Sequence, residues 1–254
     1  MGAGIPHNRQ LMEVFMHKQF TEPIFSQLSV YRDRLVEHPL LTAARGGELP
    51  VPILHELAFH QFSDSILWIP MLAQMKSKTH RSRRLRRAIE DNIAHEAGLN
   101  GDPTAHPSHV TLAVEMMRSL GLRATPEFPR EAFDRSATHW LSDDFARFGE
   151  PEIAGWLLTA ETLVPLFFEA IVPGFDTLGS DTRYFHEHIH IDADEHATWM
   201  AEAVGDVVDL YGPSAIPAII VGMREAWEDT IEVPDELWKR AQAPSLSVPV
   251  HRRA

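Results

Sequence analysis

Helical spacing of apolar residues runs through nearly the whole chain and limits the folds open to it. Apolar side chains recur every three to four positions, and the alternating pattern of half-buried strands is missing. Turn signals such as Gly46-Gly47, Pro173-Gly174 and Gly212-Pro213 separate the periodic segments. The predicted helices cover residues 9–20, 23–36, 50–76, 80–98, 108–120, 129–148, 150–171, 180–211 and 213–240. The sequence therefore predicts an all-α fold, a bundle of about seven to nine helices.

The chain length and the lack of internal linkers favour one domain. Its 254 residues fit one large domain, and no low-complexity segment interrupts residues 50–240. Residues 241–254 are rich in Pro and Ser. We therefore expect a single helical domain over residues 1–240 and a flexible tail over 241–254.

The absence of cysteine limits the chemistry of the chain. It excludes disulfides, thiolate metal ligands, iron–sulfur clusters and cysteine nucleophiles. Any bound metal must be held by histidines and carboxylates, which suits iron or manganese and is less diagnostic of zinc.

The charge balance bears on partners and location. A formal net charge of −13 argues against a general nucleic-acid binder. The cluster Arg81, Arg83, Arg84, Arg86 and Arg87 is predicted to be a solvated helix face. No signal-peptide pattern opens the chain, and no apolar run approaches the roughly 20 residues that span a bilayer. We expect a cytoplasmic protein that binds neither nucleic acid nor membrane, and we leave a homodimer open.

Three potential metal ligands recur at four-residue intervals in the predicted helix 180–211. On a helix, this spacing places His188, Asp192 and His196 on one face. That face also carries Phe185, Ile189, Trp199, Met200, Ala203 and Val207, so it is predicted to point into the core. A rival register, with His186, His190 and Asp194, has more polar neighbours. A buried His-Asp-His ladder needs partners, which either a metal or a hydrogen-bonded cluster without metal would supply.

Three further polar residues interrupt apolar stripes on other predicted helices. Glu96 ends the stripe of Leu85, Ile89 and Ile93, and His109 begins the next helix after a loop. Glu161 is the only charged residue between Glu152 and Glu169. The alternatives are a capping or satisfied core role for His109 and an ion pair with arginine for Glu161.

Together, these residues have the composition of a two-metal site. The set is Glu96, His109, Glu161, His188, Asp192 and His196. A catalytic zinc typically takes three protein ligands, whereas six suit two metals with open positions. Two ferrous ions would bring four positive charges against three carboxylates, leaving a nearly neutral site that tolerates burial. The two Glu-x-x-His motifs of ferritin-like proteins are missing at these positions.

The order of these residues resembles that of the heme-oxygenase-like di-iron oxidases and oxygenases. This superfamily also holds thiaminase-II-like proteins and pyrroloquinoline-quinone synthase. The resemblance covers roughly residues 50–210 and rests on Asn92-Ile-Ala-His-Glu96 with Ser108-His109, on Ala160-Glu161-Thr-Leu-Val-Pro165, and on His188 to His196. Two positions stay open. Some members place the last histidine where this chain has Glu195, and some add an early carboxylate, for which Asp64 is the candidate and His60 the alternative.

The resemblance implies a heme-oxygenase-like bundle that binds two ferrous ions and uses O2 as co-substrate. Members oxygenate amine nitrogens or oxidatively cleave amino acids or fatty acids. We expect a small amine or amino-acid-derived substrate, with N-oxygenation ahead of C–C cleavage, and we leave an external electron donor open as a further partner. A non-catalytic metal-binding bundle is the alternative from another class. A thiaminase-like hydrolase is disfavoured by the missing cysteine.

Overall fold

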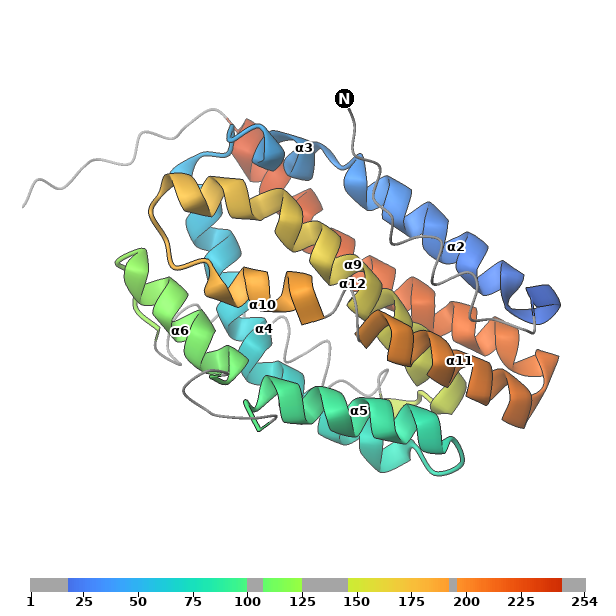
Figure 1. Ribbon diagram of the computed structural model, residues 1–254. Helices are drawn as coiled ribbons and strands as arrows, with labels where there is room; N and C mark the ends of the chain where they lie inside the picture. Colours follow the sequence, from blue (N-terminus) through green and yellow to red (C-terminus); the bar gives the residue numbers. More distant parts are fainter. Residues whose placement is uncertain (1–17, 100–106, 125–145, 192–195, 244–254) are drawn as a thin grey trace, which may run out of the picture.

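Helices make up most of the described chain. The computed structural model describes residues 18–99, 107–124, 146–191 and 196–243 (Figure 1). Its elements are α2 (Lys18–Val36), α3 (Pro39–Arg45), α4 (Val51–Lys78), α5 (Arg83–Glu96), α6 (His109–Ser119), α9 (Glu150–Thr177), α10 (Arg183–Ile191), α11 (Ala197–Tyr211), the 3₁₀ turn η2 (Pro213–Ala215) and α12 (Ile216–Gln242). No strand occurs among these residues. The predicted all-α bundle is therefore confirmed.

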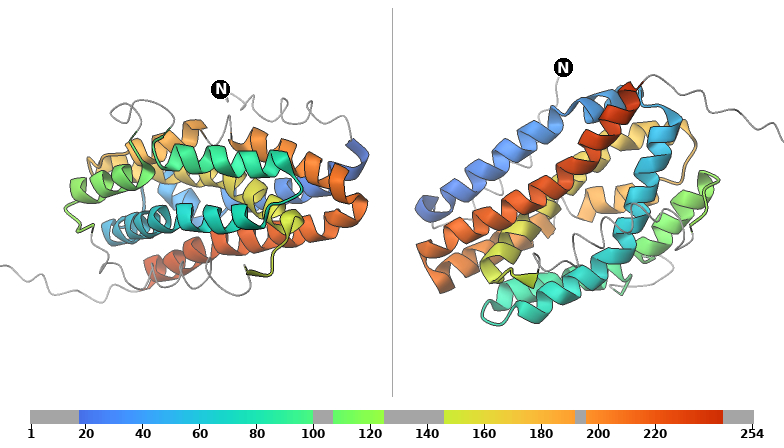
Figure 2. Two further views of the ribbon diagram at one scale, coloured as in Figure 1. Left: turned by 90° about the horizontal axis from the view of Figure 1, so that it is seen from below. Right: turned by 180° about the vertical axis from the view of Figure 1, so that it is seen from behind.

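Helix α9 is the axis of the bundle. It packs most extensively against α12 and also contacts α2, α3, α10 and α11 (Figures 1 and 2). In the part of the chain that the structure describes, α9 is long and apolar enough to cross a membrane, but 78% of its apolar window is buried. Only the pair of α11 with η2 and α12, bent by 119°, would pass the same test. The apolar character of α9 is thus accounted for by its position in the core.

Two glycines allow α9 and α12 to approach closely. A Cβ added to Gly155 of α9 would lie 2.0 Å from the carbonyl oxygen of Ile219 on α12. A Cβ added to Gly222 of α12 would lie 1.9 Å from the carbonyl oxygen of Glu152 on α9. The two backbones therefore meet at a crossing that side chains would hold apart.

Helices α4, α5 and α6 form a second group, with α6 at the left and α5 along the bottom of Figure 1. Helix α4 packs against α5 and α6, while α5 also packs against α11 and α6 against α10. The side chain of Ser82 accepts a hydrogen bond from the backbone N–H of Leu85, and Ser108 accepts one from Thr111. These N-caps fix where α5 and α6 begin. Glu96, the last residue of α5, and His109, the first of α6, thereby come to adjacent helix ends.

The structure corrects several predicted helix boundaries. The short helix α3 was not predicted, and it begins after His38, whose Nδ1 accepts from the backbone N–H of Leu40 at 3.2 Å. The predicted helix over 180–211 is described as two helices, α10 and α11, with residues 192–195 between them outside the described part. Helix α12 runs to Gln242, slightly into the predicted tail. The predicted helices over 9–20 and 129–148 fall mostly outside the described residues.

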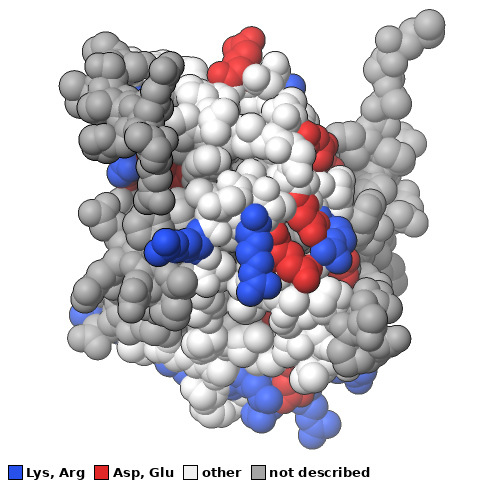
Figure 3. Space-filling model, turned by 90° about the vertical axis from the view of Figure 1, so that its left-hand side faces the viewer, with Lys and Arg blue, Asp and Glu red and all other residues white. Residues whose placement is uncertain are grey.

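Charged side chains of both signs are mixed on the surface. The face in Figure 3 shows lysines and arginines beside aspartates and glutamates. In the arginine cluster, Arg84 pairs with Glu202, Arg86 with Glu90 and Arg87 with Asp91. This pairing agrees with a solvated helix face.

A buried carboxylate joins three elements at the start of α9. Glu150 accepts hydrogen bonds from the backbone N–H groups of His80, Arg81 (2.5 Å) and Ser82 (3.0 Å) and from the hydroxyl of Tyr211 (3.1 Å). Burial alone would raise the pKa of Glu150, but the three backbone donors and the hydroxyl outweigh it and hold the pKa below its usual value. The ionised carboxylate thus ties the α4–α5 connection and the end of α11 to α9.

We expect Glu150→Gln to lower the free energy of unfolding at pH 7 by about 2 kcal/mol, because the amide loses the charge and turns a donor toward backbone donors. Urea denaturation measures the change. The pKa of Glu150 is lower in the folded protein than in the unfolded chain, where it is about 4.3. The extra stability of the wild type over Glu150→Gln is therefore complete above about pH 4.3 and is lost as the pH falls through the pKa of the folded state. In the control Glu152→Gln, the amide oxygen can still accept from the N–H of Gly149. An advantage that does not shrink in acid would contradict this assignment.

Candidate metal centre

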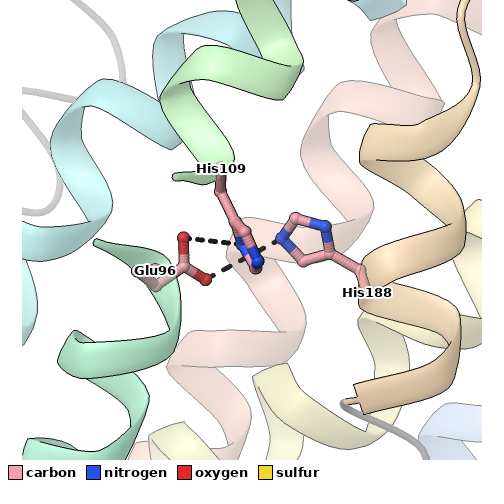
Figure 4. A group of neighbouring side chains, drawn as sticks. All are labelled: Glu96, His109 and His188. Atoms are coloured by element: carbon pink, nitrogen blue, oxygen red, sulfur yellow. Dashed lines mark ion pairs between the residues drawn. The ribbon is translucent and has the colours of Figure 1, made fainter. Parts of the chain in front are cut away.

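Three predicted ligands converge from three helices. Glu96 of α5, His109 of α6 and His188 of α10 point toward one another (Figure 4). One potential ligand atom from each residue lies within 4.8 Å of the others. All three side chains are buried, with relative exposures of 4%, 2% and 7%. This spacing is suited to a metal ion, because ligand atoms about 2.1 Å from one ion lie about 3–4 Å from each other.

The contact between Glu96 and His109 is close but is not a satisfied hydrogen bond. Nδ1 of His109 lies 2.8 Å from Oε2 of Glu96. Yet this nitrogen has no hydrogen-bond partner of acceptable geometry in the described structure. Burial lowers the pKa of His109 to about 4, so the imidazole is neutral at pH 7 and the contact is not an ion pair there. A bound metal would satisfy this buried nitrogen.

His188 is held in the tautomer that a metal ligand needs. Its Nδ1 donates to the backbone carbonyl of Tyr184 at 2.8 Å. In the neutral ring, the lone pair therefore lies on Nε2, which is 3.8 Å from Oε1 of Glu96. The ring of Phe168 contacts His188 edge-on at a centroid distance of 5.1 Å. A backbone carbonyl that fixes one ring nitrogen commonly supports the other as a ligand.

A second group of polar residues centres on Glu161 of α9. Oε2 of Glu161 accepts from Nδ1 of His196 at 3.2 Å, and Oε1 accepts from Nδ2 of Asn92 at 2.5 Å. Nε2 of His196 lies 2.8 Å from Nδ1 of His95. The relative exposures of Glu161 and His196 are 3% and 0%. Moving the His196 proton from Nδ1 to Nε2, where His95 can accept it, would turn Nδ1 into a metal ligand beside Glu161.

The two groups share one environment. Glu96, Glu161 and His188 line the same cavity of about 130 Å³. Burial raises the pKa of Glu96 to about 7; the protonated form of His188 would oppose that rise, and the charge of Glu161 adds to it. Such a carboxylate is poorly stabilised without a nearby cation, which a metal would supply.

Iron binding is expected to strengthen as the pH rises toward neutrality. A metal must displace the proton of Glu96, whose metal-free pKa is about 7. Below pH 7, the affinity for ferrous iron should therefore fall about ten-fold per pH unit, and above pH 8 this dependence should level off. Anaerobic titrations across this range measure the slope. Glu96→Gln removes the titrating group, so an unchanged slope in that variant would contradict the assignment.

The structure places most of the other predicted residues as follows. His186 is exposed while His188 is buried. At this position, α10 therefore directs the face predicted to carry the ligands into the core, and the rival face of His186 toward solvent. Asp64 lines the cavity, whereas His60 is not one of the described residues that line it. Asp192, Asp194 and Glu195 lie outside the described residues, as does the side chain of His190. Of the two candidates for the last ligand, His196 is described, and it is buried.

Two residues of this centre were missed by sequence reasoning. His95 contacts His196, and their rings stack with centroids 5.1 Å apart. Asn92 is fully buried and orients Glu161. Their spacing held a signal, because Asn92 lies one turn before both His95 and Glu96 on α5.

Comparisons with known proteins agree with this donor set. A family model described as an iron-containing redox enzyme matches residues 56–229, which is more than half of the chain. A CADD-like protein of unknown function from Nostoc punctiforme PCC 73102 shares the fold, with a TM-score of 0.65 and 15% identity over 90% of this chain and 99% of that chain. No curated protein matches the chain. The chain belongs to the family of iron-containing redox enzymes, which confirms the resemblance found from the motifs.

Iron fits the donors present. The described groups offer two carboxylates and three imidazoles and no thiolate, and histidine with carboxylate is a common ligand set for non-heme iron. Glu96, His109 and His188 would hold one ion, and Glu161 and His196 would contribute to a second.

Proposed function

We propose that this protein is a di-iron oxygenase that adds oxygen to the nitrogen of a small amine. The observation that carries the proposal is the buried convergence of Glu96, His109 and His188, including a histidine nitrogen without a hydrogen-bond partner of acceptable geometry in the described structure. The neighbouring pair of Glu161 and His196 supports a second ion. One zinc would leave part of this set without a role.

The overall reaction has a simple balance. One atom of O2 enters the amine nitrogen to give a hydroxylamine, and the other leaves as water. Two electrons from an external donor and two protons complete the equation. When bound, the iron pair would supply O2 binding and activation.

The residues of the chain would position the substrate and limit water. The cavity beside the ligands is lined by aromatic rings that include Trp68, Trp156, Phe167 and Phe168. Apolar walls reduce the access of water to reactive species. Carboxylates also line the cavity, and none of its described lining residues is lysine or arginine. This lining favours a substrate with an amine group. A substrate with a carboxylate would need a lysine or arginine to bind it, and the described lining has neither.

The proposal is tested by turnover with labelled oxygen. The protein is loaded with ferrous iron without air and then exposed to ¹⁸O2 with a reductant and a panel of small amines. We expect hydroxylamine products that carry one ¹⁸O atom, detected by mass spectrometry. Carbon-chain fragments would indicate oxidative cleavage instead, and a protein that binds iron but consumes no O2 would be a metal-binding bundle.

Glu161→Gln is the matched variant for this test. It keeps the side-chain size and an oxygen that can accept from Asn92, but it removes the charge near the second proposed ion. Product formation should fall by at least about a hundred-fold. Product formation at the wild-type rate would contradict a role for Glu161 at the iron centre.

A further inference from the structure

The cavity extends from the metal centre toward a carboxylate that the centre does not use. Asp229 of α12 lines it together with Thr230, Val233 and Pro234 of the same helix. Oδ2 of Asp229 accepts a hydrogen bond from Nε1 of Trp156 at 3.1 Å. This bond joins α12 to α9 and fixes the carboxylate at the cavity wall.

A chain of side-chain contacts connects the metal centre to Asp229. Asn92 donates to Glu161 at 2.5 Å and accepts from Nε1 of Trp68 at 3.4 Å. The rings of Trp68 and Trp156 lie 5.7 Å apart, and Trp156 then donates to Asp229. Trp156 and Glu161 are five positions apart on α9, which is about 7.5 Å along the helix axis. This chain of contacts links Asp229 to the group around Glu161 along the cavity wall.

The side chains around Asp229 are suited to binding a positively charged group. A carboxylate favours an ammonium group, and tryptophan is the best of the aromatic side chains for holding a cation over its ring. No lysine or arginine is among the described residues that line the cavity. Apolar side chains such as Val164, Phe167 and Val233 line other parts of the cavity.

We infer that Asp229, with Trp156 and Trp68, anchors the ammonium group of a short cationic substrate whose other end reaches the metal centre. This inference rests on the proposed function, because it assigns the anchor of that same site. A molecule held in this way presents a second position to the iron. If oxygen enters at nitrogen, the substrate is therefore a diamine or a similar molecule with two amines, and the anchored nitrogen is not the one that reacts.

Binding to the metal-free protein tests the anchor apart from the iron chemistry. The probes are n-pentylamine, n-pentanol and pentanoate, which share a chain and differ in charge, and calorimetry gives their affinities. The wild type should bind the amine at least about thirty-fold more tightly than the alcohol, and the carboxylate most weakly. Equal binding of the amine and the alcohol, or no binding of any probe, would overturn the inference.

Asp229→Asn removes the charge but keeps an oxygen that can accept from Trp156. It should reduce amine affinity by at least about thirty-fold and leave alcohol affinity unchanged. Asp235→Asn is the matched control on α12, because Asp235 is 56% exposed, pairs with His38 and does not line the cavity. A structural role of Asp229 would weaken amine and alcohol alike, which would also overturn the inference. If the protein binds the amine selectively but takes up no iron, the role of Asp229 as an anchor would stand and the proposed function would be refuted.

Discussion

His188→Ala is expected to weaken the binding of ferrous iron by at least about a hundred-fold. Loss of a residue that merely supports a ligand already costs ten- to a hundred-fold in metal affinity, and loss of the ligand itself should cost no less. Nε2 of His188 faces Glu96, while its Nδ1 is held by the carbonyl of Tyr184. No second nitrogen can replace it from the same position. Iron per chain after anaerobic loading and desalting gives the result, and O2 consumption should fall with it.

His186→Ala is the matched control. It removes the same ring from the same helix two positions away, but His186 is exposed. Iron content and O2 consumption should stay at the wild-type level. If the two variants lose iron equally, or if His186→Ala loses more, then the assignment of His188 rather than His186 as the metal ligand from α10 is wrong.

Gly155→Ala is expected to destabilise the fold by about 3 kcal/mol, the upper end of the usual cost of overpacking. The added Cβ would lie 2.0 Å from a backbone oxygen of α12, and backbone cannot move aside as a flexible side chain can. Helices α9 and α12 would have to separate along the most extensive contact of the bundle. Thermal and urea unfolding both measure the loss.

Two comparisons separate the clash from a general effect of replacing glycine. Gly46→Ala adds a Cβ that meets only the side chain of Glu48, so it should change stability by less than about 1 kcal/mol. Gly222→Ala should cost about as much as Gly155→Ala, because it strikes the same crossing from the other helix. The double variant should cost less than the sum, since the helices separate only once. Strict additivity of the two changes would contradict a single shared crossing.

The fold was largely predictable because the periodicity of the core is recorded in the sequence. The apolar run of α9 and the stripes of α5 and α6 each gave a helix at nearly the right place. Helix α3 was missed because seven residues are too few for a periodic signal. The close approach at Gly155 and Gly222 was also invisible, since a single glycine in a helix does not show which backbone it meets.

The centre was predictable where a polar residue interrupts an apolar stripe. Glu96 and Glu161 stood out for this reason, and both are buried. His95 was missed because its role depends on the contact between α5 and α11, which brings it to His196. Asp229 was missed because an aspartate on a half-polar helix resembles a surface residue until α9 places Trp156 beside it. These contacts join residues far apart in the chain, and spacing along one helix carries no record of them.

The number of irons per chain tests the central claim most directly. The wild-type protein is titrated with ferrous iron without air, and bound iron is counted after removal of the excess. The two groups around Glu96 and Glu161 predict saturation at about two ions per chain. His188→Ala and Glu161→Gln should each lower that number. Saturation at one ion, or uptake that neither substitution changes, would contradict a di-iron centre at these residues.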